Sequence, residues 1–128
     1  MVVNGVDLSD HVRSVSLVLG IAGRPAHTVA DIQDYEMPGT QVVQDPTIAF
    51  YQDYAAGEVY ATLMTLWQNR TTFNLVVKND AGATSVTNQA FTVPVFVKSL
   101  PVLSGERGNE HMADVTCGVA GAMTIATS

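Results

Sequence analysis

The chain has 128 residues, of which 47% are apolar and only 14% are charged. Charged residues average about 25% in soluble proteins, so much of this surface is expected to be covered by other protein, as in a subunit of an assembly. The net charge of −6 argues against indiscriminate binding to nucleic acid, and no apolar run approaches the roughly 20 residues that cross a bilayer.

The amino-terminal residues and the cysteine content indicate where the protein is made. The first residues lack the basic start and the apolar stretch of a secretory signal. Cys117 is the single cysteine, so an intrachain disulfide is excluded. A lone thiol in an apolar strand is usually a small core residue. We therefore expect synthesis in a reducing cytosol.

The first half of the chain predicts strands and one long excursion. Asn4-Gly5 lies between short apolar runs and predicts a tight hairpin. Alternating apolar residues from Val15 to Ile21 predict a strand of about ten residues. Residues 23–45 hold Pro25, Pro38 and Gly39 among scattered polar residues, and so long a loop is uncommon without a function.

Within this excursion, the segment 32–43 carries enough apolar surface to form a hairpin that docks on a neighbouring molecule. Disorder until assembly is the alternative. The residues predicted to form this oligomer interface are Ile32, Tyr35, Met37, Val42 and Val43.

The second half predicts a helix between strands. Thr47–Tyr51 has the alternation of a strand, whereas Val59, Leu63, Leu66 and Trp67 have the spacing of an amphipathic helix over about 58–69. Further strands are expected over 72–78, 91–97 and 113–119, with Pro94 placing its strand at a sheet edge or a bulge.

These elements predict one mainly β domain over residues 1–128, an antiparallel β-sandwich or small barrel with one flanking α-helix. The predicted core residues are Leu17, Leu19, Phe50, Leu63, Leu66, Trp67, Phe73, Leu75, Val95, Val115 and Cys117.

The acidic residues are unevenly distributed. Residues 25–69 contain six acids and neither Lys nor Arg, while the remainder of the chain is balanced. This stretch predicts a surface that repels a polyanion or meets a basic partner, with a plain solvated loop and strand edge as the alternative. The acids of the predicted lining or outer face are Asp31, Asp34, Glu36, Asp45, Asp53 and Glu58.

Motifs for cofactors and catalysis were not found in the sequence. It lacks the glycine-rich phosphate loops and the His or Cys spacings of zinc sites. His11, His27 and His111 are far apart, and Cys117 lies on an inward row where burial disfavours a thiolate nucleophile. We therefore predict no catalytic residues, no cofactor, no metal and no enzymatic activity.

Several segments resemble tail tube proteins of long-tailed bacteriophages of actinobacteria. The opening Val3–Leu17 is similar to the start of that family, and Phe50–Val59 to its passage from strand into helix. Phe73–Lys78, Leu103–Glu106 and Val119–Thr124 are similar to later family segments. The likeness covers about two thirds of the chain in degenerate motifs, and residues 20–45 match poorly.

The resemblance implies a virion protein, made in the bacterial host cytoplasm, whose copies form hexameric rings that stack through a long loop into a tube with an acidic lumen. Its partners would be itself and other virion proteins, without specific nucleic-acid or membrane binding. One alternative is a capsid decoration or minor capsid protein of the same fold. A carbohydrate-binding β-domain is a lesser alternative, whose usual sign is a row of exposed aromatic residues.

Overall fold

The computed structural model describes residues 1–26, 28–30, 32–103 and 105–128. Ten strands and one helix lie in these ranges. In chain order they are β1 (Val2–Val3), β2 (Val6–Asp7), β3 (Val12–Ser16), β4 (Leu19–Pro25), β5 (Glu36–Val43), β6 (Thr47–Tyr51), α1 (Val59–Gln68), β7 (Phe73–Lys78), β8 (Ala90–Ser99), β9 (Met112–Val119) and β10 (Thr124–Ala126). In these ranges, no helix combines the length and the hydropathy needed to cross a membrane.

Eight strands form one antiparallel sheet in the order β2-β1-β7-β8-β9-β6-β3, with β10 pairing beside β8. The chain is mainly β with one flanking helix, as the alternating patterns predict. The first hairpin turns at Asn4 and Gly5, whose φ angles of 48° and 81° are those of the tight turn that this dipeptide favours.

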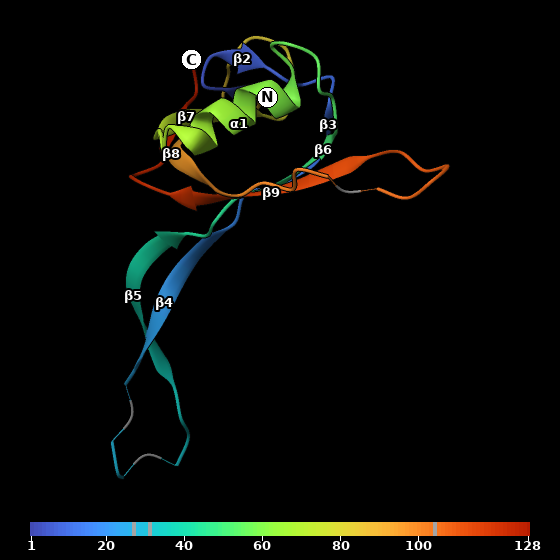
Figure 1. Ribbon diagram of the computed structural model, residues 1–128. Coiled ribbons are helices and arrows are strands. Elements are labelled where there is room, and N and C mark those ends of the chain that lie inside the picture. Colours follow the sequence, from blue (N-terminus) through green and yellow to red (C-terminus); the bar gives the residue numbers. More distant parts are fainter. Residues whose placement is uncertain (27, 31, 104) are drawn as a thin grey trace.

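The sheet curves around one core, and α1 lies across it near β7 and β8 (Figure 1). The core takes the inward row of each long strand, including Phe50 from β6 and Leu75 from β7. The helix contributes Val59, Leu63 and Leu66, the part of its stripe that faces the sheet. Of the other predicted core residues, Phe73, Val95, Val115 and Cys117 are buried and Leu17 is half-buried at the margin.

Two predicted core residues are exposed. Trp67 is 52% exposed, because the buried stripe of α1 ends at Leu66 and the next position has turned toward solvent. Leu19 is 57% exposed, because the alternation that begins in β3 continues into β4 after the chain has left the sheet. An alternating apolar pattern identifies a strand, but it does not show whether another part of the protein covers the apolar face.

The predicted single strand from Val15 is two strands. β3 ends at Ser16 and pairs with β6, while β4 begins at Leu19 and pairs with β5 in a separate two-stranded sheet. This β4–β5 hairpin projects away from the body of the molecule (Figure 1). The excursion was expected to begin at residue 23, but the hairpin begins at Leu19. Its first strand, β4, includes residues that the alternating pattern had assigned to the main sheet.

Pro94 does not lie at a sheet edge, because β8 has partners on both sides. On one side β7 pairs along residues 90–95, and on the other side β10 pairs with residues 90–92 and β9 with residues 95–99. Pro94 lies where the second partner changes from β10 to β9. A missing N–H is tolerated at this gap, which explains how a central strand accommodates proline.

Candidate assembly surface

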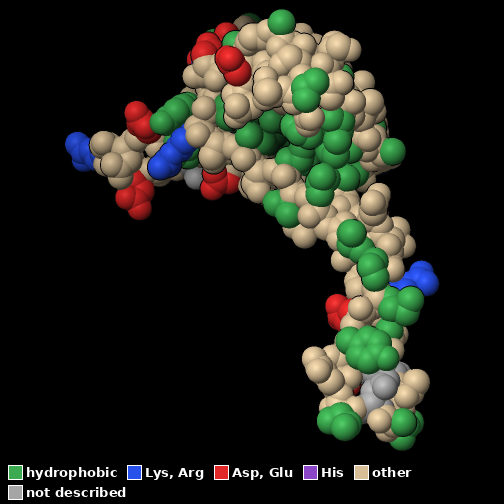
Figure 2. Space-filling model, turned by 180° about the vertical axis from the view of Figure 1, so that it is seen from behind, with side chains coloured by type: hydrophobic (Ala, Val, Ile, Leu, Met, Phe, Trp, Pro, Cys, Tyr) green, Lys and Arg blue, Asp and Glu red, His purple; other side chains and the backbone are tan. Residues whose placement is uncertain are grey.

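The β4–β5 hairpin exposes large apolar side chains along its length. Met37 in β5 is 58% exposed, and Ile21 in β4 is exposed to a similar extent. Hydrophobic side chains continue from the hairpin onto the adjoining face of the body, with few charged groups between them (Figure 2). A two-stranded ribbon has no core of its own, so in the described part of the chain these side chains are left exposed.

The predicted interface residues all belong to this hairpin. Met37, Val42 and Val43 lie in β5, while Ile32 and Tyr35 lie in the connection between its strands. Val43 is half-buried against the core where the hairpin joins the body, and the other four are exposed. Sequence reasoning missed the β4 side of the same surface, because its alternating pattern resembles that of a core strand.

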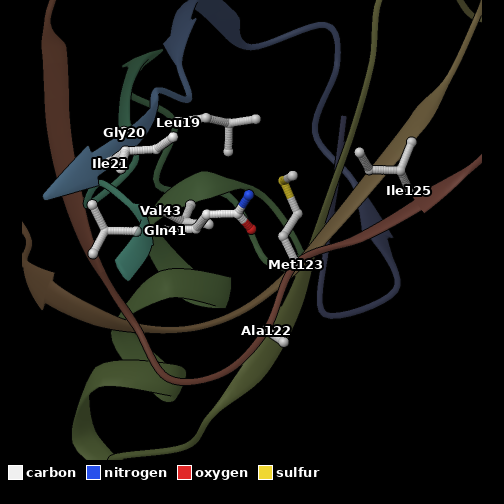
Figure 3. Close-up of a pocket in the computed structure, with 9 residues that line it drawn as sticks. Leu19, Gly20, Ile21, Gln41, Val43, Ala122, Met123 and Ile125 are labelled. Carbon is white, nitrogen blue, oxygen red and sulfur yellow. The ribbon is translucent and has the colours of Figure 1, made fainter. Parts of the chain in front are cut away.

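An apolar groove of about 820 Å³ lies at the base of the hairpin. Residues of both hairpin strands form one side, and the segment that leads into β10 forms the other (Figure 3). Its lining residues are Leu19, Gly20, Ile21, Gln41, Val42, Val43, Ala122, Met123 and Ile125. One polar side chain among so many apolar ones favours a protein segment over a polar ligand.

The acids predicted to form one lining lie in three places. Asp34 and Glu36 belong to the hairpin, and Asp31 lies outside the described residues. Asp45 lies at the junction with the body, where its Oδ2 is 2.9 Å from Nζ of Lys98. The lysine and the Val119 N–H, which donates to the other oxygen, lower the pKa of Asp45. This acid is therefore paired with a cation from a distant strand.

The remaining two acids surround a histidine. Nε2 of His11 is 3.2 Å from Oδ2 of Asp53, and Nδ1 is 2.8 Å from Oδ1 of Asp10 and 3.6 Å from Oε2 of Glu58. His11, Asp53 and Glu58 place donor atoms within 4.8 Å of one another. However, Asp53 and Glu58 face different ring nitrogens, which is the geometry of an imidazolium between carboxylates. His11 and Asp53 are 42 residues apart in the chain, so no sequence motif indicated this cluster.

Comparison with known proteins finds similarity of structure. No protein-family model and no curated protein matches the sequence. A chain in the virion of a native gene transfer agent particle superposes with a TM-score of 0.69 and 11% identity, over 91% of this chain and 85% of that chain. A chain in the C6-symmetric tail of an empty gene transfer agent particle superposes with a TM-score of 0.67 and 12% identity, over 91% of this chain and 83% of that chain.

A third solved structure extends this comparison. A chain in the sixfold-symmetrised baseplate of the anti-feeding prophage superposes with a TM-score of 0.56 and 8% identity, over 91% of this chain and 79% of that chain. At such identities the shared property is the fold. The chain therefore has a fold that occurs among the subunits of phage-like particles.

Proposed function

We propose that this chain is a structural subunit of a bacteriophage virion, without enzymatic activity, and that it forms the tail tube. The observation that carries the proposal is the projecting β4–β5 hairpin with its uncovered apolar side chains. The fold supports it, because similar chains occur in a particle tail and a baseplate described with sixfold symmetry.

Burial of the hairpin supplies the driving force for assembly. Removing apolar surface from water contributes roughly 25 cal/mol per Å². Ile21, Met37 and Val42 present such surface on a ribbon that, among the described residues, consists of two strands. A second copy of the chain that covers the hairpin and the groove at its base would bury this surface.

A contact between a projecting hairpin and a different surface of the next copy is heterologous. Such contacts close into rings or continue into tubes, and they do not stop at a symmetric dimer. We therefore propose hexameric rings that stack into a conduit for DNA. The long hairpin suits the stacking contact, because it reaches well beyond the sheet that carries it (Figure 1).

We also propose that acidic side chains line the conduit, but fewer of them than the sequence suggested. Asp45 is paired with Lys98, and Asp53 and Glu58 face His11, so these three acids are partly neutralised. The repulsion of DNA would then depend more on Glu36 of the hairpin, and on where the ring places it.

Electron microscopy of the purified protein tests the proposal. Leu19 and Val43 are cross-strand partners, so Asn-Gly can replace residues 20–42 and close the shortened ribbon as a tight turn. We expect rings or tubes from the wild-type chain, and a folded protein without stacked particles from the shortened chain. Stacked particles that persist without the hairpin would contradict the proposal.

A pair of point variants provides a matched control. Met37 and Val86 are both exposed large apolar residues, but Val86 lies outside the hairpin in the connection between β7 and β8. Met37→Asp should prevent stacking, whereas Val86→Asp should leave it intact. Small oligomers that bind empty phage capsids would instead favour a capsid decoration protein.

A further inference from the structure

The His11 ring faces carboxylates at both of its nitrogens, and this fixes its most favourable charge state. A neutral imidazole carries one N–H, so its other nitrogen would present a lone pair to a carboxylate. The imidazolium donates from both nitrogens, to Asp10 at 2.8 Å and to Asp53 at 3.2 Å. The geometry therefore favours the protonated ring, with Glu58 as a third nearby anion.

This cluster holds the segment that leads into α1. Oδ1 of Asp53 accepts the Ala55 N–H at 2.8 Å, and its backbone carbonyl accepts the Tyr60 N–H at 3.0 Å. Glu58 is the residue immediately before the helix. The Tyr51 N–H also donates to the carbonyl of His11 at 2.7 Å. Residues 51–58 are thus tied to His11 by backbone and side chain together.

The same segment anchors a second projection, which we name the arm and define as residues 100–103 and 105–111 between β8 and β9. The Gln52 N–H donates to the carbonyl of His111 at 2.9 Å. The Tyr54 hydroxyl donates to the carbonyl of Val102 at 3.0 Å. The arm extends beyond the body of the molecule (Figure 1). Its base is therefore attached to the segment that the His11 cluster also holds.

We propose that His11 is a pH-sensitive latch, which as an imidazolium holds residues 51–58 and, through them, the base of the arm. Loss of the ring proton removes one of the two donors and leaves a lone pair facing a carboxylate. The segment and the arm then loosen together. In the described part of the chain, the charged groups that face the ring are Asp10, on its own segment, and Asp53 and Glu58, before α1.

The direction of the pH response follows from the same contacts. The hydrogen bond to Asp10 raises the pKa of His11 above its ordinary 6.5, against the opposing effect of desolvation, and the bond to Asp53 adds to the rise. The latch is therefore fully formed below pH 6.5 and is lost as the pH rises through the pKa of the folded protein. This inference is independent of the proposed tail function, because it concerns a single chain.

Amide hydrogen exchange tests the latch, with rates divided by the intrinsic rate at each pH. We expect protection of the peptides covering 52–60 and the arm to fall about threefold or more between about pH 6 and pH 8.5 in the wild-type chain. His11→Gln should remove this pH dependence, and His111→Gln should retain it. An equal pH dependence in the wild-type chain and His11→Gln would overturn the proposal.

A second measurement needs no variant. Nitrogen chemical shifts of the His11 ring, followed by NMR against pH, report both its charge and its midpoint. We expect an imidazolium whose midpoint lies above 6.5. A midpoint at or below that value would overturn the latch even if His11→Gln failed to fold.

Discussion

The aromatic ring of Phe96 lies on the bare backbone of Gly118, its cross-strand partner in β9. A Cβ at residue 118 would be 2.4 Å from Cζ of Phe96 and 2.6 Å from Cε1, which is closer than side chains tolerate. The glycine therefore gives a half-exposed aromatic side chain a flat surface to pack on, at the centre of the sheet.

Gly118→Ala should lower the free energy of unfolding by about 1 kcal/mol, because the partly exposed Phe96 ring must move off the sheet and give up the apolar contact it makes there. Urea unfolding measures the change. In a Phe96→Ala background the same substitution should cost little, since the clash is gone. Gly20→Ala is the matched control, because its Cβ would meet neighbours at 3.5 Å. An equal cost of Gly118→Ala with and without Phe96 would contradict this account.

Trp67→Ala should cost only about 1 to 2 kcal/mol, because half of the indole is already in water. Leu63→Ala, on the buried stripe of the same helix, should cost about 2 to 5 kcal/mol. Urea unfolding of the two variants compares them directly. A larger loss for the tryptophan than for the leucine would show that Trp67 belongs to the core after all.

The Cys117 thiol should be unreactive in the folded protein. Desolvation by burial, with a smaller contribution from the Asp45 carboxylate, raises its pKa to about 11. Almost none of it is thiolate near neutral pH, and the thiolate is the reactive form. A chromogenic disulfide reagent should therefore label the thiol in urea and leave it unmodified in buffer. Comparable rates under the two conditions would contradict its burial.

The pairing of Asp45 with Lys98 should make stability sensitive to acid. Because the folded protein lowers the pKa of Asp45 from 3.8, its contribution is present above pH 3.8 and is lost as the pH falls through the lower value in the folded protein. The difference in unfolding free energy between the wild-type chain and Asp45→Asn should therefore shrink between pH 7 and pH 3. Asp114→Asn, which changes an exposed carboxylate in β9, is the control.

Local signals predicted the local elements. The Asn4-Gly5 turn, the alternation of β6 and the spacing of Val59, Leu63 and Leu66 each specify an element by short-range geometry. The same signals could not place Leu19 or Trp67, because burial depends on what the rest of the fold brings near. The pairing of β10 with β8 is likewise a long-range result that no periodicity encodes.

The sequence predicted only part of the candidate assembly surface, because local signals do not show which distant segments come together. An apolar loop rich in proline and glycine indicated the hairpin, and Met37 and Val42 were found in it. The groove at its base combines the two hairpin strands with residues 122–125, and Ala122 follows Val43 by 79 residues in the chain (122 − 43). The His11 cluster joins segments 42 residues apart. The sheet topology brings these distant segments together, and no spacing in the sequence indicates that they meet.

Hydroxyl-radical footprinting of Met37 tests the central claim, that another copy of the chain covers the hairpin. Oxidation of Met37 should be fast in the dispersed chain, where the residue is 58% exposed, and strongly slowed after concentration into particles. Met64 on α1 serves as the internal reference. If Met37 is oxidised as fast in concentrated protein as in the dispersed chain, the hairpin is not an assembly contact and the account is wrong.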